Sequence, residues 1–460
     1  MFRNTRHIHM VAIGGVGMSG IAEILLNLGF RVSGSDLRPS PATERLARLG
    51  ATIHLGHRPE QIAGADVVVY SSAVTAANPE IVEARRRRVP VVRRADMLAE
   101  LMRLKYGIAI AGSHGKTTTT SLVAAVLAEG ALDPTVLVGG RVLATGRNAV
   151  LGSGEYLVAE ADESDGTFLR LTPTIAVVTN VDLEHVDHYP DLVALRAAFA
   201  EFLARVPFYG ACVLCLDDPE VRGLVARLDR KVITYGLSAE AQVRAVPAAS
   251  TPDGPAVATV FAHGRELGPL ELRLRGRHNL VNALAAVAVG MELGVSFGQI
   301  AAGLARFTGV GRRFEERGEH GGVRVVDDYG HHPTEIGATL QVARDTGRRV
   351  AVLFQPHRYT RTARFRHEFA DALAVADAVA LLPVYAASEE PQPGVDSGLI
   401  ASGLREKGLA GVSLVEDLDE VRAWLDAAVR PGDLLLTLGA GDIGRLVEPI
   451  CGHLDARRLP

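Results

Sequence analysis

The sequence is poor in cysteine, in aromatic residues and in charge of one sign. Its 460 residues include 3 cysteines and 5% aromatic residues, and the formal net charge is -4. So few cysteines, and an odd number of them, fit a reducing compartment and exclude a disulfide-built fold. Wholesale binding of nucleic acid or of an anionic membrane normally needs a basic face. We therefore expect no nucleic acid and no membrane among the partners.

Long apolar runs are also absent, and none approaches the ~18 residues that a membrane span needs. The first apolar stretch follows two arginines, as in a signal peptide, but four glycines interrupt it and no cleavage site follows. Cys212 and Cys215 lie in an apolar segment that predicts a buried strand, and no second pair completes a zinc site. These absences predict a cytoplasmic protein.

The length suggests two to four domains. Short apolar strands alternate with helical patterns almost throughout, which is typical of parallel α/β layers. Near residues 240–275 the helical periodicity fades, which indicates a small antiparallel sheet. We predict an N-terminal Rossmann-like domain (1–105), a central P-loop-type ATPase domain (106–312) and a C-terminal Rossmann-like α/β domain (313–460).

The segment GSHGKT, from Gly112 to Thr117, is the most specific motif. Glycines let backbone amides surround phosphate oxygens, and the helix that follows adds its positive end. Lys116 would contact the β- and γ-phosphates, and Thr117 would offer a hydroxyl to Mg²⁺ or Mn²⁺. The loop is two residues shorter than the full G-x-x-x-x-G-K-T pattern, because Ile110 stands where the first glycine would fall. The motif predicts an ATP site.

Two polar clusters follow the next predicted strands. EADESD, from Glu160 to Asp165, holds four carboxylates, which repel one another unless a cation compensates them. Mg²⁺ takes oxygen ligands and commonly bridges substrate phosphates. A second cluster runs from Asn180 to His188, and a histidine there suits a second metal ligand or a general base. Either cluster alone is more often a solvated loop, but behind a phosphate loop they predict a metal–ATP site.

The first glycine-rich loop, from Gly14 to Gly20, is similar to the dinucleotide fingerprint, with Asp36 at the place of a ribose-binding acid. This pattern suits NAD and the pyrophosphate of a UDP-sugar equally. The lysine-bearing second loop favours the UDP-sugar, because hydride transfer has no need of ATP. An NAD-dependent oxidoreductase is therefore a distant alternative, and a nucleotide-regulated binding protein without chemistry is another.

Charged residues also follow strands of the third predicted domain. DDYGHHP begins at Asp327 and HRYTR begins at His357. Arginine pairs bidentately with carboxylates such as that of an amino acid, although a surface set of salt bridges is equally open. In GRHNLVNALAA, Asn279 and Asn282 share one helical face, where they would contact adenine or cap the helix.

Together these motifs resemble the Mur ligase family over essentially the whole chain. They appear in family order as GSHGKTTTT, EADESD, TNVDLEHVDHY, GRHNLVNALAA, GVGRRFE, DDYGHHPTE, FQPHRYTRT and GAGDIG. The resemblance implies an ATP-dependent ligase of peptidoglycan precursor synthesis, a monomer or weak homodimer. It would join the lactyl carboxylate of UDP-N-acetylmuramate to L-alanine through an acyl phosphate. The branch that adds a murein tripeptide to the same sugar nucleotide is the nearest alternative.

The resemblance also implies roles for single residues. Those expected at ATP are Gly112, Ser113, His114, Gly115, Lys116, Thr117, Thr118, His278, Asn279, Asn282 and Arg313. Those expected at the UDP-sugar are Gly14, Gly15, Val16, Gly17, Met18, Ser19, Gly20, Asp36, Ser71 and Ser72. Those expected at L-alanine and the reacting carboxylate are Tyr329, His331, Arg358 and Arg361. The expected metal ligands are Thr117, Glu160 and His185, and the expected catalytic residues are Lys116, Glu160, His185, His331 and Arg358.

The sequence departs from the family pattern at two places. Several branches carry a carbamylated lysine where Phe199 stands here, so a carbamylated metal bridge is not expected. Glu184 stands where aspartate is commoner, directly before His185.

Overall fold

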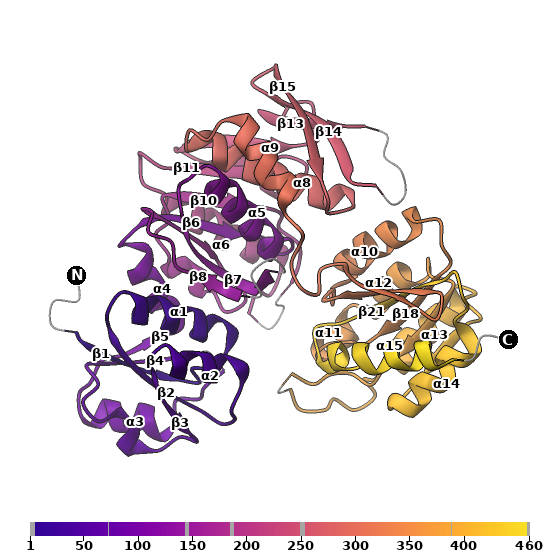
Figure 1. Cartoon of the computed structure of the whole chain (residues 1–460), viewed down its shortest axis with the longest axis horizontal. Helices are drawn as coiled ribbons and strands as arrows, with labels where there is room; N and C mark the ends of the chain where they lie inside the picture. The colour runs from indigo at the N-terminus through magenta and orange to yellow at the C-terminus, as the bar shows by residue number, and fades with distance from the viewer. Residues whose placement is uncertain are drawn as a thin grey trace. The chain divides into compact units, whose positions relative to one another are not determined.

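The structure is a computed structural model. It describes residues 5–71, 73–142, 147–184, 188–248, 254–387 and 389–457. The described chain forms two compact units, of which the second comprises residues 309–460 and two short earlier segments. Each unit is described by itself, with the elements labelled as in Figure 1.

The first sheet has five parallel strands in the order β3-β2-β1-β4-β5. The strands are β1 His7–Val11, β2 Arg31–Asp36, β3 Thr52–Leu55, β4 Val67–Tyr70 and β5 Val91–Arg93. The helices between and after them are α1 Val16–Asn27, α2 Pro41–Arg48, η1 Pro59–Ile62, α3 Pro79–Arg86 and α4 Arg94–Met102. The strand order reverses beside β1, and ligands of such sheets bind outside the carboxyl ends at that point. The predicted Rossmann-like fold is confirmed.

The second sheet has ten strands in the order β15-β14-β13-β12-β11-β10-β6-β9-β7-β8. The strands are β6 Tyr106–Ala111, β7 Thr135–Val142, β8 Arg147–Val150, β9 Tyr156–Glu160, β10 Ile175–Val178, β11 Ala211–Cys215, β12 Lys231–Gly236, β13 Val243–Pro247, β14 Ala256–Ala262 and β15 Arg265–Leu272. The helices are α5 Lys116–Glu129, η2 Thr167–Arg170, α6 Leu192–Ala204, α7 Pro219–Val225, α8 Arg277–Glu292 and α9 Phe297–Arg306. β13, β14 and β15 pair antiparallel, as the sequence predicts near 240–275.

The topology of the second sheet brings three loops together. β6 lies between β9 and β10 and is parallel to both, so the carboxyl ends of all three strands share one edge. The loops that leave these ends carry the phosphate motif, the acidic cluster and the Asn180 cluster. This is the edge at which an open α/β sheet binds its ligand.

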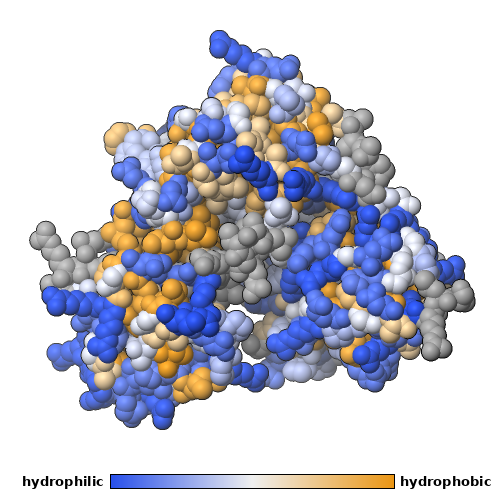
Figure 2. Space-filling model, in the orientation of Figure 1, coloured by the Kyte–Doolittle hydropathy of each residue, from blue (hydrophilic) through white to orange (hydrophobic). Residues whose placement is uncertain are grey.

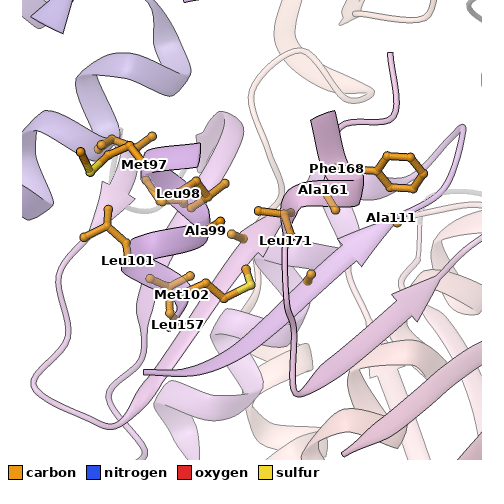
Figure 3. Packing of buried hydrophobic residues seen from close by; sticks show 14 of the residues in the cluster. Met97, Leu98, Ala99, Leu101, Met102, Ala111, Leu157, Ala161, Phe168 and Leu171 are labelled. Atoms are coloured by element: carbon orange, nitrogen blue, oxygen red, sulfur yellow. The ribbon is translucent and has the colours of Figure 1, made fainter. Parts of the chain in front are cut away.

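The first and second sheets belong to one unit because they share an apolar core. Figure 3 shows residues of α4 packed among residues of β9 and of the segment around η2. Leu98 and Met102 of α4 lie in the same buried cluster as Leu157 and Leu171. Gly20 of α1 faces the central sheet so closely that an added Cβ would lie 2.8 Å from Leu137 Cδ2. The shared core therefore fixes the first glycine loop relative to the central sheet.

The third sheet has six strands in the order β16-β17-β21-β18-β19-β20, and only β16 is antiparallel to its neighbour. The strands are β16 Glu315–His320, β17 Val323–Asp328, β18 Val350–Phe354, β19 Ala378–Leu381, β20 Val412–Leu414 and β21 Leu434–Leu438. The helices are α10 Pro333–Asp345, α11 Tyr359–Arg364, α12 Arg366–Leu373, α13 Gly398–Glu406, α14 Leu418–Ala428, η3 Asp442–Arg445 and α15 Val447–Ala456. The three predicted α/β sheets are thus confirmed, while the boundaries at residues 105 and 312 stay predictions.

The cysteines, the surface and the helices agree with the features expected from the sequence. Cys212 and Cys215 are free and buried in β11, and burial raises the pKa of each thiol to about 11. Hydrophobic residues on the face in Figure 2 form patches broken by hydrophilic ones. Among the described residues, no helix is long and apolar enough to cross a membrane.

Phe199, near which the family resemblance puts the lysine of other branches, is fully buried on α6. Its ring packs edge-on against Phe168, with the ring centroids 5.4 Å apart. Phe168 also stacks on Phe202 at 5.1 Å. A charged group at this position would lose its hydration without a partner, which agrees with the expectation that no carbamylated lysine stands here.

We predict that Phe199→Ala lowers the free energy of unfolding of the first unit by about 3–5 kcal/mol, because it opens a cavity in this cluster. Urea denaturation followed by far-UV circular dichroism measures the change. Phe208→Ala is the matched control, since Phe208 is 90% exposed and its loss should cost less than ~0.5 kcal/mol. Equal midpoints for the two variants would contradict the packing role.

Candidate active site

The phosphate loop needs glycine at two positions. Gly112 has φ +133°, and a Cβ added to it would lie 2.0 Å from Thr179 Oγ1. Gly115 has φ +81°, and its added Cβ would lie 2.7 Å from Asn282 Oδ1. Both conformations are unfavourable for residues with a side chain. The loop is therefore pressed between the end of β10 and the first turns of α8.

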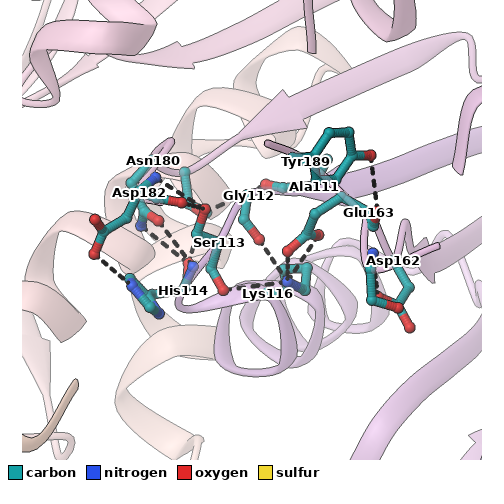
Figure 4. A network of polar contacts seen from close by, with 12 residues as sticks. Ala111, Gly112, Ser113, His114, Lys116, Asp162, Glu163, Asn180, Asp182 and Tyr189 are labelled. Atoms are coloured by element: carbon teal, nitrogen blue, oxygen red, sulfur yellow. Dashed lines mark hydrogen bonds and ion pairs between the residues drawn. The ribbon is translucent and has the colours of Figure 1, made fainter. Parts of the chain in front are cut away.

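Hydrogen bonds join the loop to the residues that follow β10 (Figure 4). Asn180 accepts from the His114 amide at 2.8 Å and donates to the His114 carbonyl at 3.0 Å. The Ser113 hydroxyl donates to the Asp182 carbonyl at 2.9 Å, and His114 Nε2 lies 2.9 Å from Asp182 Oδ2. Two of the three loops at this sheet edge are thus bound to each other before any ligand arrives.

Lys116, the first residue of α5, forms an ion pair with a buried glutamate. Its ammonium lies 2.8 and 2.9 Å from the two carboxylate oxygens of Glu163, which is fully buried. The ammonium also donates to the Gly112 carbonyl at 2.6 Å. Burial alone would lower the pKa of Lys116, but the carboxylates of Glu163, Asp162 and Glu184 outweigh it and raise the pKa. The lysine is therefore a fixed positive charge at the mouth of the loop.

The other carboxylates of EADESD have different surroundings. Asp165 accepts from the Thr167 amide at 3.0 Å, at the start of η2. Asp162 accepts from the Ser164 amide at 3.1 Å and lies 3.9 Å from the Arg94 guanidinium. Glu160 ends β9 and lines a cavity with Asp162. Glu163 is the member of the cluster that pairs with Lys116. The family resemblance gives Glu160 a different role, that of a metal ligand.

Two other predicted ATP-site residues lie on the phosphate-loop helix. Thr117 and Thr118 are buried in the first turn of α5, directly beside Lys116. Asn282 lies against Gly115, and Asn279 lies one turn earlier on α8. His185, the predicted metal ligand, lies outside the described residues.

The first glycine loop is bound to β2 by its predicted acid. Asp36 Oδ2 accepts from the Gly14 amide at 2.9 Å, so this carboxylate orients the loop. Gly15 precedes α1, and Ser71 follows β4 at the same sheet edge. Met18 and Ser19 are buried, so their side chains face the core. The side chain of Val16 and all of Ser72 lie outside the described residues.

The predicted amino-acid residues lie together in the second unit. The rings of Tyr329 and His331 contact at 5.5 Å, and those of His331 and His357 at 5.6 Å. Arg361 is buried and donates to His357 Nδ1 at 3.2 Å. Arg358 has the unusual φ of +70°, which the Tyr385 carbonyl supports by accepting from its amide at 2.8 Å.

A second group of the same unit surrounds Arg313. Its guanidinium lies 5.2 Å from the centroid of the Tyr329 ring and 3.7 Å from Glu335. Burial raises the pKa of Asp328 to about 6, while Arg313 and two backbone amides oppose the rise. Burial and then Arg313 lower the pKa of His278 to about 4, so this imidazole is neutral near pH 7.

Sequence reasoning missed four residues of these arrangements: Arg94, Glu163, Asp182 and Tyr385. Glu163 and Asp182 lie inside quoted motifs, but a motif does not say which carboxylate faces the cation. Tyr385 stacks on His357 with ring centroids 5.6 Å apart, a contact between distant segments without a sequence signal. Arg94 belongs to no motif of the chain.

Three family models match the chain, each over one of the three sheets. Residues 7–106 match the Mur ligase family catalytic domain, residues 110–290 the Mur ligase middle domain, and residues 312–441 the Mur ligase glutamate ligase domain. Together these matches account for most of the sequence.

Individual relatives agree with the models. The UDP-N-acetylmuramate–L-alanine ligase of Desulfosudis oleivorans is 53% identical, over 98% of this chain and 99% of its own. The ligase of the same name from an Anaeromyxobacter species is 55% identical, over 98% of both chains.

Solved structures show the same similarity. The UDP-N-acetylmuramate-alanine ligase of Thermotoga maritima is 32% identical with a TM-score of 0.80, over 96% of this chain and 99% of its own. The murein peptide ligase of Psychrobacter arcticus, at 22% identity and a TM-score of 0.72 over 99% of this chain and 100% of its own, shares the fold. With all three of its domains matched, the chain belongs to the Mur ligase family.

Proposed function

We propose that this chain is an ATP-dependent ligase that joins L-alanine to the lactyl carboxylate of UDP-N-acetylmuramate, a step of peptidoglycan precursor synthesis. The observation that carries the proposal is the phosphate loop, whose glycines let the backbone turn tightly against Thr179 and Asn282, directly before the buried charge of Lys116. Relatives of that name are more than half identical to this chain over nearly its whole length. The predicted cytoplasmic location and monomeric or weakly dimeric state belong to the same proposal.

The chemistry requires ATP because a carboxylate is a poor electrophile at neutral pH. A carboxylate oxygen of the sugar acid attacks the γ-phosphorus, the bond from phosphorus to the bridging oxygen breaks, and ADP leaves. The amine of L-alanine then attacks the acyl carbon. The tetrahedral intermediate expels inorganic phosphate, and the nitrogen loses a proton. Lys116 lies where it neutralises charge on the transferring phosphoryl group.

The donor set near the loop fits a magnesium ion. Oxygen ligands are what Mg²⁺ requires, and it commonly binds through one or two carboxylates together with substrate phosphates. Thr117 in the first turn of α5 and Glu160 at the end of β9 offer such oxygens on neighbouring elements. With His185, they are the residues that would hold the ion. Bound there, it would neutralise phosphate charge and orient the phosphoryl group.

The amino acid is assigned to the second unit. Tyr329, His331 and Arg361 lie close together, and a buried guanidinium suits the carboxylate of an amino acid. A cavity of about 410 Å³ opens at the carboxyl ends of β18, β19 and β21, lined in part by Tyr385. His331 would help to hold the substrates, and Arg358 follows β18 at the same edge of the sheet.

A murein tripeptide is the second candidate acceptor, because a murein peptide ligase has the same fold. We predict that phosphate release with ATP, Mg²⁺ and UDP-N-acetylmuramate depends on L-alanine, and that the tripeptide supports less than about 1% of that rate. A coupled phosphate-release assay with the two acceptors measures this. A faster rate with the tripeptide would assign the chain to the other branch, and release without any acceptor would contradict the ligase proposal.

We further predict that Lys116→Ala lowers the rate of ADP formation by at least about 10³-fold, because it removes the fixed charge that meets the phosphates. Lys231→Ala is the matched control, since Lys231 pairs with Glu292 on the surface, remote from the loop. Thermal unfolding of both variants shows whether they fold. Near-wild-type turnover by folded Lys116→Ala would rule out the role given to this lysine.

A further inference from the structure

A cavity of about 210 Å³ lies between the two sheets of the first unit. Gly17 of α1 and Arg94 of α4 line it from the first sheet. Leu137 of β7, Glu160 and Asp162 line it from the central sheet. The cavity thus has one guanidinium and two carboxylates in an otherwise largely apolar wall.

Arg94 faces this cavity with its guanidinium largely uncommitted. Its Nη2 lies 3.9 Å from Asp162 Oδ2, which is too far for a hydrogen bond. Across the described ranges, its side chain makes no other ion pair and no hydrogen bond. A guanidinium has five N–H donors, and those of Arg94 stay accessible, with 26% of its side chain exposed. The arrangement leaves a place for an anion from solution.

Gly17 is shaped to admit this arginine. A Cβ added to Gly17 would lie 2.9 Å from Arg94 Nη1 and 3.2 Å from its Cδ. A larger residue at position 17 would require the guanidinium to shift from this position. The third glycine of the first loop therefore has a specific neighbour, at a position where Arg94 meets the first turn of α1.

We propose that Arg94 binds the reacting carboxylate of the sugar nucleotide in this cavity and holds it for phosphoryl transfer. The inference rests on the proposed function, which requires an acid between two nucleotide sites. The cavity extends from Gly17 of the first loop to Glu160, and Ile110 beside Glu160 is two residues before the phosphate loop. A planar guanidinium matches a carboxylate in two parallel hydrogen bonds.

The charged side chains that line the cavity favour a substrate carboxylate beside Arg94 over any other position in the cavity. The carboxylate of Asp162 repels a further anion in the cavity, so the incoming acid needs a cation beside it. Among the described residues that line the cavity, Arg94 is the only lysine or arginine. Because Asp162 is too far away to hydrogen-bond to the guanidinium, the N–H groups of Arg94 stay available to the substrate.

Comparing the binding of two sugar nucleotides distinguishes recognition of the carboxylate from recognition of the diphosphate. UDP-N-acetylglucosamine lacks the lactyl carboxylate of UDP-N-acetylmuramate. We predict that Arg94→Ala in the full-length protein weakens binding of UDP-N-acetylmuramate by about 10- to 100-fold. Binding of UDP-N-acetylglucosamine should change less than about twofold. Isothermal titration calorimetry with both ligands measures the difference.

A conservative variant and a control variant distinguish a specific loss of binding from a general loss of folding. Arg94→Lys keeps the charge without the fork and should lose less affinity for the acid than Arg94→Ala does. Arg103→Ala, at the exposed end of the same helix, should leave both affinities unchanged.

Equal losses for the two ligands would place Arg94 at the diphosphate and overturn the proposal, as would unchanged affinity for the acid. The wild-type protein tests the function separately, by phosphate release with UDP-N-acetylmuramate and L-alanine. A wild-type protein without turnover rejects the function. An active wild-type protein with an equally active Arg94→Ala variant rejects only the role of Arg94.

Discussion

The buried ion pair between Lys116 and Glu163 is the interaction on which the nucleotide site depends. Removing either partner would leave an uncompensated buried charge, which typically costs about 3–5 kcal/mol. The pair joins the acidic segment after β9 to the first turn of α5, while the loop carbonyls of Gly112 and Ser113 curve around the same ammonium. An arriving triphosphate therefore meets a charge that is already in place, as electrostatic preorganisation requires.

The sheet order explains why this pair and the surrounding hydrogen bonds can form. Only a strand with parallel neighbours on both sides brings three loops to one edge, and β6 has β9 and β10 beside it. The apolar core that α4 shares with the central sheet connects the first glycine loop to that sheet. Both proposed nucleotide sites therefore belong to one unit. The residues proposed for the amino acid belong to the other unit. The proposed reaction therefore needs the two units to act together, which is a common reason for domain closure in ligases.

Strand and helix alternation was enough to predict the three α/β sheets, because hydrophobic periodicity is a local property. The phosphate loop could also be predicted from the sequence, since Gly112 and Gly115 have conformations that favour glycine. The sequence could not predict which residues of the site contact one another. A loop after a strand has no periodicity, so the spacing of EADESD could not show that Glu163 faces Lys116. Arg94 meets Gly17 only through the packing of α4 on the central sheet, and no pattern near either residue predicts that contact.

Different carboxylates of the EADESD segment lie beside different cations: Glu163 pairs with Lys116, and Asp162 lies near Arg94. Four neighbouring carboxylates predict a compensating cation, and the protein itself supplies two, Lys116 on one side and Arg94 on the other. Glu163 binds its cation tightly in the interior, so that cation is fixed. Asp162 lies at a looser distance from Arg94, so that guanidinium can still accept a ligand. The difference between 2.8 Å and 3.9 Å agrees with the two proposed roles, in which a fixed Lys116 neutralises the phosphates and an available Arg94 binds the acid.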